Sequence, residues 1–268
     1  MSRLSWILAV GAVSALLGAL PAAAQEDGKD GKRMIFFGRT LSAHVLLGVG
    51  PDYIGSDDYK VSPGGSLSLS TPGAEPVFTA PDDGVNLGLI GDNTFSAGPV
   101  GRWRSGRDDH GDLKGFDKID WAIEAGAFAV WWPADWLRLR GEVRRGFGGN
   151  TAWAATVGAD AVYRKASWTM SIGPRLRWAD DKFTRTYFGV TPAEAARSPF
   201  GVTAYDADGD FLSMGVLGSL EYQWSPRWSF TSNAEYQRLT GDAADSPIVS
   251  ELGSKDQFRV TVGVQYAF

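Results

Sequence analysis

The chain has 268 residues, of which 44% are hydrophobic and 21% charged, and its formal net charge is −5. This balance excludes a disordered chain and a basic protein that coats nucleic acid. The absence of cysteine excludes a disulfide scaffold, a thiolate zinc site and thiol catalysis, and the two histidines leave little room for other metal or triad chemistry.

The N-terminus has the pattern of a secretory signal peptide. Arg3 is the only charge before Glu26, and the residues after it are apolar and small. This apolar stretch of about fifteen residues is short for a membrane-spanning helix of about 20. Alanines at positions 22 and 24 form an A-x-A cleavage site. We therefore predict a signal peptide over residues 1–24, cut after Ala24, and a periplasmic leader over residues 25–38.

Beyond the leader, hydrophobic residues recur with a period of two, which is the period of a β-strand. The last segment is the clearest case, because every even position from Phe258 to Phe268 is apolar or aromatic, while Arg259 and Gln265 lie on the other parity. The alternation predicts twelve strands. Ten is the alternative, because Pro81–Gly84 is either a turn or a kink in one long strand. The twelve cover residues 39–49, 59–70, 76–81, 84–91, 93–104, 118–131, 135–147, 151–164, 167–178, 210–224, 227–239 and 257–268.

Strand length and the placement of aromatic residues favour a membrane barrel over a soluble sandwich. Most strands run about 11–14 residues, against about 5–6 in soluble sheets and about 9–11 in tilted membrane strands. Aromatics stand at both ends of an apolar face, as in Trp153 with Tyr163 and Trp168 with Trp178. In hydrocarbon every backbone group needs a partner, so such strands must close into a barrel.

Short turns alternate with long connections along the chain, as in an outer-membrane barrel with both termini in the periplasm. The long connections are expected at about 105–117, 180–209 and 241–256. We therefore predict an all-β fold, a transmembrane antiparallel up-and-down β-barrel over residues 39–268, located in the outer membrane and surrounded by its lipid.

Three loop blocks resemble the MipA/OmpV family of outer-membrane barrels. They are GPDYIGSDDY at 50–59, a stretch at 178–198 that begins WADDKF, and LTGDAADSPIV at 239–249. Residues 71–86 depart from the family, which has a more regular strand there. The family takes its name from a protein that interacts with a lytic transglycosylase. The resemblance implies a non-catalytic scaffold in the cell envelope, with murein hydrolases and synthases as partners.

The chain end resembles the terminal-aromatic signal that the barrel-insertion machinery reads during biogenesis. The residues that carry this resemblance are Gly263, Tyr266 and Phe268.

The loop blocks supply candidate partner-binding residues, because function usually lies in the loops of such a scaffold. Thr191, Pro192 and Glu194 also have the spacing of a helix start, which predicts a short helix over 191–198. That helix is expected either as a lid over the barrel mouth or as a docking surface. The candidates are Asp52, Tyr53, Gly55, Ser56, Asp57, Asp58 and Tyr59 in the first block, and Tyr187, Phe188, Gly189 and Val190 in the second.

Charged residues of both signs lie on the parity that faces the lumen. They either pair across the barrel and hold it rigid or line a water-filled pore, and the mixture of signs favours pairing. A small-solute channel is therefore the alternative function. The inward charges include Asp120, Glu124, Arg138, Arg140, Glu142, Arg144, Asp160, Arg175, Arg177, Glu221 and Glu235.

An outer-membrane hydrolase is the enzymatic alternative, and it would need a histidine beside a carboxylate or serine at the rim. His110 is the only loop histidine and has aspartates around it, a setting more typical of a solvated loop. The aspartates of the first block lack the spacing of a calcium-binding loop. We therefore expect no catalytic residue, no metal and no cofactor, and no nucleic-acid partner.

Overall fold

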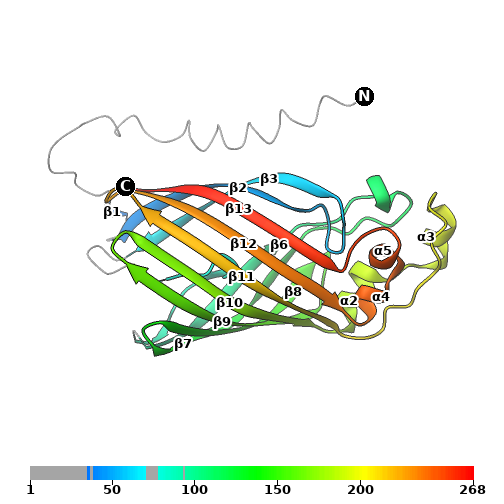
Figure 1. Ribbon diagram of the computed structural model, residues 1–268. Coiled ribbons are helices and arrows are strands. Elements are labelled where there is room, and N and C mark those ends of the chain that lie inside the picture. Colours follow the sequence, from blue (N-terminus) through cyan, green and yellow to red (C-terminus); the bar gives the residue numbers. More distant parts are fainter. Residues whose placement is uncertain (1–34, 37–38, 71–77, 93) are drawn as a thin grey trace.

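The structure is a computed structural model that describes residues 35–36, 39–70, 78–92 and 94–268. These residues form a tilted antiparallel barrel with helices gathered at one end (Figure 1). The predicted signal peptide and nearly all of the predicted leader lie outside the described residues. None of the described helices is both long and apolar enough to cross a membrane.

Long strands make up the barrel wall, and three two-residue strands, β1 (Ile35–Phe36), β4 (Val85–Asn86) and β5 (Ile90–Gly91), join the same sheet. In the described part of the chain, ten strands have ten or more residues. They are β2 (Arg39–Pro51), β3 (Tyr59–Ser70), β6 (Phe95–Arg104), β7 (Ala122–Ala134), β8 (Leu137–Gly148), β9 (Trp153–Lys165), β10 (Trp168–Ala179), β11 (Phe211–Gln223), β12 (Trp228–Thr240) and β13 (Asp256–Ala267).

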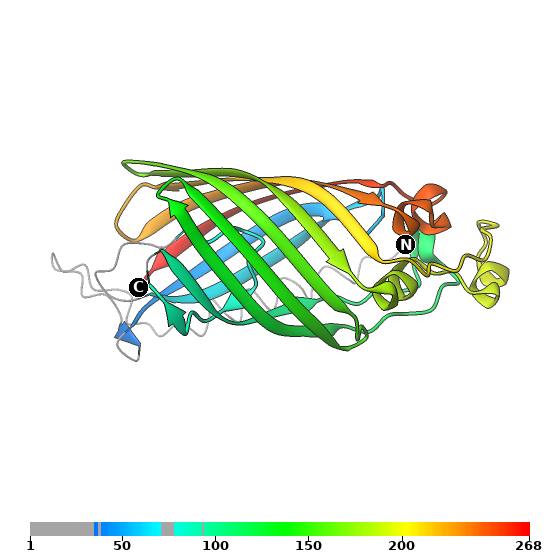
Figure 2. The ribbon, with the colours of Figure 1, turned by 90° about the horizontal axis from the view of Figure 1, so that it is seen from below.

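Each long strand pairs antiparallel with its neighbour, in the order β3-β2-β13-β12-β11-β10-β9-β8-β7-β6, and β4 and β5 both pair with β6. The last strand therefore lies beside the first, with Val264 opposite Val45. Figure 2 shows the strong tilt of the strands. The ends of this order, β3 on one side and β4 with β5 on the other, have no strand pairing with each other among the described residues. The predicted barrel fold is confirmed.

The period-two alternation separates a lipid-facing surface from a lumen. Val157 and Ile172 point outward and are 57% and 61% exposed, whereas inward residues of the neighbouring strands are buried. Aromatic rings stack near both ends of the outer surface. Trp103 and Trp121 lie 4.5 Å apart near the end with helices, and Trp168 and Tyr222 lie 4.3 Å apart at the other. These are the two aromatic belts of a membrane barrel.

The two ends of the barrel differ. One carries the C-terminus and the tight turns after β7, β9 and β11. The other carries the short turn between β8 and β9 and the long connections with α2 (Asp181–Phe188), α3 (Pro192–Arg197), α4 (Asp242–Asp245) and α5 (Pro247–Ser250) (Figure 1). Short turns face the periplasm and long loops face the cell exterior in such barrels. The predicted helix over 191–198 is confirmed as α3, because the Thr191 side chain caps it and Glu194 completes the capping box.

The region around residues 76–91 differs from the prediction. The strand expected over 76–81 is absent from its described residues, 78–81, which lead into a turn closed by the Asp83 amide on the Ala80 carbonyl at 3.0 Å. The strand expected over 84–91 forms only as β4 and β5. Pro81 has no amide hydrogen to donate to a ladder, and the aspartates beside it are drawn to arginines inside the barrel.

Candidate functional site

An arginine-rich surface lines one side of the lumen, and it is called here the arginine wall. Inward side chains recur at every second residue, so Arg138, Arg140 and Arg144 of β8 share one face. Four carboxylates from neighbouring strands lie among the arginines. The wall comprises Arg102 and Arg104 of β6, Arg138, Arg140 and Arg144 of β8, and Arg175 and Arg177 of β10, with Glu124 of β7, Glu142 of β8, Asp160 of β9 and Glu235 of β12.

Asp160 is the centre of the most deeply buried part of the wall. Its two carboxylate oxygens accept from Arg138 Nη1 at 3.0 Å and from Arg175 Nη2 at 2.7 Å. Glu142 pairs with Arg140 on its own strand at 2.6 Å and also with Arg144. A Cβ on Gly158 would lie 3.1 Å from the Arg175 guanidinium, so glycine leaves the room that this side chain fills. The pairs compensate each other's desolvation, which buried charges require.

Residues 78–84, called here the acidic turn, fold into the lumen and complete this network. Asp82 accepts from Arg175 Nε at 2.9 Å and from Arg177 Nη2 at 3.2 Å. Asp83 accepts from Arg138 Nη2 at 2.5 Å and lies 3.1 Å from Arg140 Nε. The turn is therefore tied to strands β8 and β10, far from it in sequence.

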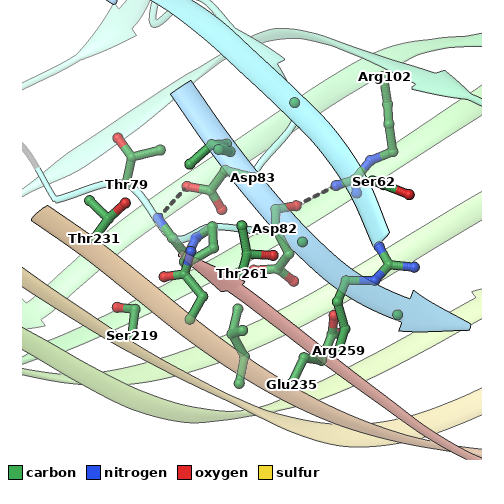
Figure 3. A pocket seen from close by; sticks show the side chains of 18 of the residues that line it. Ser62, Thr79, Asp82, Asp83, Arg102, Ser219, Thr231, Glu235, Arg259 and Thr261 are labelled. Atoms are coloured by element: carbon green, nitrogen blue, oxygen red, sulfur yellow. Dashed lines mark hydrogen bonds between the residues drawn. The ribbon is translucent and has the colours of Figure 1, made fainter. Parts of the chain in front are cut away.

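Arg102 and Phe78 hold the two ends of the acidic turn. Arg102 donates to the backbone carbonyl of Asp82 at 2.5 Å, and the Phe78 ring packs edge-on against Trp132 with 6.3 Å between centroids. In Figure 3 the side chains of Asp82 and Asp83 lie among residues that line the cavity of the barrel. The acidic turn is therefore a fixed part of the lumen.

The rest of the lumen is a cavity of about 1340 Å³. It extends from Phe183 and Tyr187 at the end with long loops to Arg227 and Ala267 at the end with tight turns. The wall opposite the arginines is mostly neutral and polar. Its cavity-lining side chains include Ser62 of β3, Ser219 of β11, Thr231, Asn233 and Gln237 of β12, and Thr261 and Gln265 of β13.

A folded cap covers the end with long loops, and it is built from the connections 52–58, 105–121, 180–210 and 241–255. Phe188 and Ile248 are fully buried in it. Two buried clusters pack together there, one around Phe183, Tyr187, Phe188, Phe211 and Val249, the other around Leu113, Phe116, Val190, Val202 and Ile248.

Polar contacts join the cap across long sequence distances. Arg107 Nη1 donates to the Tyr187 carbonyl at 2.7 Å, and Ser246 Oγ donates to the Phe188 carbonyl at 2.6 Å. The Gln257 side chain accepts from the Gly55 amide and donates to the Ser56 carbonyl, both at 3.0 Å. The three sequence blocks that resembled one family thus meet in one packed structure.

The candidate partner-binding residues fall into two groups. Gly55, Ser56, Tyr187, Phe188 and Val190 are buried, and Gly189 ends α2 beside them. Tyr53 is half-buried and donates to the Leu252 carbonyl at 3.2 Å, and burial raises the pKa of its hydroxyl. These residues build the cap and offer little surface. Those that offer more surface are Asp57, Asp58 and Tyr59, which are exposed, and Asp52, which is half-buried and pairs with Lys60 at 2.8 Å.

The outer loops gather acidic side chains near His110. Burial raises the pKa of Asp112, and the carboxylates of Asp58, Asp57 and Asp52 raise it further. His110 Nε2 lies 3.6 Å from Asp52 and is largely exposed, which is the contact of a solvated loop pair. Within the described ranges, no three histidine, aspartate or glutamate side chains are arranged to hold a metal ion.

The predicted lumen charges lie where the alternation placed them, with one correction. Asp120 precedes β7, which begins at Ala122 and not at 118, and its side chain is exposed outside the network. Glu221 lines the cavity. Glu124, Arg138, Arg140, Glu142, Arg144, Asp160, Arg175, Arg177 and Glu235 all belong to the arginine wall.

The period-two pattern did not identify Asp82 and Asp83 as lumen residues, because they belong to no strand. The only sequence signal was a Pro-Asp-Asp-Gly turn in a segment too irregular for a wall strand. The predicted insertion-signal residues lie on β13 or directly after it. Tyr266 packs against Trp228 with 4.7 Å between ring centroids, and the Phe268 amide donates to Leu41.

A family model described as MltA-interacting protein MipA matches residues 45–268. The MltA-interacting protein of Escherichia coli (strain K12) is 28% identical over 106 residues, which are 40% of this chain and 40% of that protein. Outer membrane protein OmpV of Vibrio cholerae is 36% identical over 93 residues, which are 35% of this chain and 34% of that protein. The match spans less than half the length of each of these relatives.

Solved structures with a similar shape are also outer-membrane barrels. The NanC porin has a TM-score of 0.46 at 10% identity and covers 84% of this chain and 100% of its own. An outer membrane channel from Pseudomonas putida F1 has a TM-score of 0.44 at 12% identity and covers 91% of this chain and 100% of its own. Because the family model matches most of the sequence, this outer-membrane chain belongs to the MltA-interacting protein MipA family.

Proposed function

We propose that the chain is a non-catalytic adaptor that holds a murein-remodelling enzyme at the inner surface of the outer membrane. The observation that carries this proposal is family membership, since a relative is named for its interaction with MltA. The interior supports it, because a chain of ion pairs links each of the strands from β6 to β10 to others of this set, and a packed cap covers the outer end. A stiff barrel of this kind suits a fixed platform better than a moving part.

The partner is expected at the end with tight turns, because murein lies in the periplasm. Arg164 and Lys165 are exposed where β9 meets β10, and Arg227 lies in the turn between β11 and β12. The opposite end carries the exposed carboxylates of Asp57 and Asp58. Arg164, Lys165 and Arg227 thus form a basic patch on a rim that also carries the exposed Asp92 and Asp135, and a partner with an acidic surface would be steered to that patch.

Binding of a purified lytic transglycosylase to the detergent-solubilised barrel tests this proposal. The variant Arg164→Glu/Lys165→Glu should weaken binding on the order of tenfold or more, because it places like charges opposite the partner. The matched control is Asp57→Lys/Asp58→Lys at the outer end, which should bind as the original chain does. Equal binding by both variants, or none by the original chain, contradicts the proposal.

A second candidate function, a path for small polar solutes, is favoured by the cavity alone. Its volume of about 1340 Å³ and its lining of hydroxyl and amide groups would admit a hydrated molecule. Planar-bilayer recording of the purified protein tests it, since a path gives discrete conductance steps. A folded barrel without such steps would exclude this candidate and leave the adaptor role untouched.

A further inference from the structure

The arginine wall has more positive charge than its own carboxylates neutralise. Its seven arginines stand against four carboxylates that come from the strands. Asp82 and Asp83 supply two of the three missing negative charges, although they belong to the acidic turn and not to a strand. Without that turn, the wall would be an unfilled site for anions.

Asp82 binds the wall as a free carboxylate would. The Nε of Arg175 lies 3.1 Å from one oxygen and 2.9 Å from the other, and Arg177 Nη2 lies 3.2 Å from the second. The single Nε–H of Arg175 is thus shared between both oxygens, and Arg177 adds a second charge-assisted hydrogen bond, the kind of contact by which guanidinium groups bind carboxylates. A small carboxylic acid presents the same group, so the contacts of Asp82 define the ligand that the site fits.

Burial differs between the two aspartates. The Asp83 and Arg138 side chains are 4% and 3% exposed, which makes this pair the dry anchor of the turn. Asp82 is 12% exposed, and its partner Arg177 is 19% exposed and lines the cavity. Arg177 therefore meets a solute in the cavity, whereas Arg138 and Arg140, the partners of Asp83, do not line it.

We propose that the arginine wall is a carboxylate-binding site that the acidic turn occupies with its own carboxylates, so that the turn acts as a built-in occupant of the site. The site takes small organic acids, and the chain's own Asp82 stands in their place. This inference goes beyond the adaptor role and does not depend on it, because it concerns the lumen and not the rim.

Chemical rescue tests the site in the full-length protein. In the variant Asp82→Asn/Asp83→Asn, succinate should raise the midpoint of thermal unfolding, because it restores charge to the arginines. Succinamide, its neutral counterpart, should not. The original chain should respond to neither, since its site is filled. The control Glu221→Gln removes a cavity-lining carboxylate with no ion pair among the described residues, and it should also respond to neither.

The single variant Asp82→Asn keeps the Asp83 anchor and serves if the double variant does not fold. Equal effects of succinate and succinamide on the folded variant would overturn the proposal. A second readout is the ratio of chloride to potassium permeability in planar bilayers. It should rise on the order of tenfold in the double variant, because an uncovered arginine wall concentrates anions. A folded variant with an unchanged ratio would show that the turn does not shield the arginines from anions.

Discussion

The arginine wall and the cap are two buried regions built from opposite chemistries. The wall lies inside the barrel, where Asp160 pairs with both Arg138 and Arg175 and all three residues are 1–4% exposed. The cap lies beyond the strands, where Phe188 and Ile248 pack in apolar clusters. A soluble protein would place the apolar core inside its sheet and the charges outside it.

The difference follows from which surface meets lipid. A membrane barrel turns its apolar residues outward, so the alternate residues, which are polar, face the lumen. That interior gains its order from ion pairs and hydrogen bonds. The loops stand in water, where burial of apolar side chains is again favourable. The cap therefore gains its order from the hydrophobic effect.

Removal of one charge from the wall should give the largest loss of stability. Asp160→Ala leaves two buried guanidinium groups, those of Arg138 and Arg175, without their shared partner. Breaking a buried ion pair costs about 3–5 kcal/mol. Urea unfolding of the barrel in lipid vesicles measures the loss. A change below about 1 kcal/mol, the usual net value of a hydrogen bond, would mean that water compensates these arginines.

A cavity in the cap should be the next most costly change. Phe188→Ala removes a fully buried ring that packs 5.8 Å from Phe211, centroid to centroid. Such truncations cost about 3 kcal/mol or more. Limited proteolysis of the outer loops should detect the change before the strands unfold, because the cap lies outside the membrane. If the loops of this variant resist protease as well as those of the original chain, apolar packing is not what holds the cap together.

A backbone change in the cap should have a moderate effect. Gly55 has a φ of +98°, and a Cβ there would lie 2.6 Å from Val249. Gly55→Ala should therefore cost about 1–3 kcal/mol through strain and overlap. The matched control is Gly111→Ala, which also has a positive φ but open space around it. Thermal unfolding of both variants separates the overlap from the strain, and equal losses would exclude a role for the Val249 contact.

The smallest effect is expected from Glu194, whose carboxylate is buried at the N-terminus of α3. Burial raises the pKa of Glu194, but the amides of Asp117 and Thr191 outweigh it, so that pKa lies below its ordinary value of 4.5. A depressed carboxyl pKa stabilises the fold above pH 4.5, and this contribution disappears as pH falls through the folded value. Loop protection measured by hydrogen exchange should therefore fall on acidification.

The variant Glu194→Gln checks that pH dependence. It keeps much of the hydrogen bonding of the capping box but has no carboxyl group, so it should lose about 1 kcal/mol at neutral pH and very little more in acid. An unaltered pH profile in this variant would assign the acid response to other carboxylates of the loops.

Several features of the fold could be predicted from local sequence alone. The alternation from Phe258 to Phe268 and the aromatics at strand ends identified membrane strands, because strand geometry and lipid contact act on neighbouring residues. The helix at 191–198 was predictable for the same reason, since Thr191 and Glu194 are three residues apart. Asp120 was wrongly assigned to a lumen-facing strand, because the alternation in the sequence extends upstream of Ala122, where β7 begins.

The partners of the inward charges were decided only by the tertiary structure. Parity showed that Arg138 and Arg175 face the lumen, but the ion pairs with Asp160 depend on the register of three strands. The contacts of the acidic turn were still harder to predict, because the carboxylates of Asp82 and Asp83 pair with arginines 55 to 95 positions away in the sequence. Local sequence thus determined which side of the wall each residue faces, while the register of the strands and the folding of the acidic turn into the lumen decided what fills the interior.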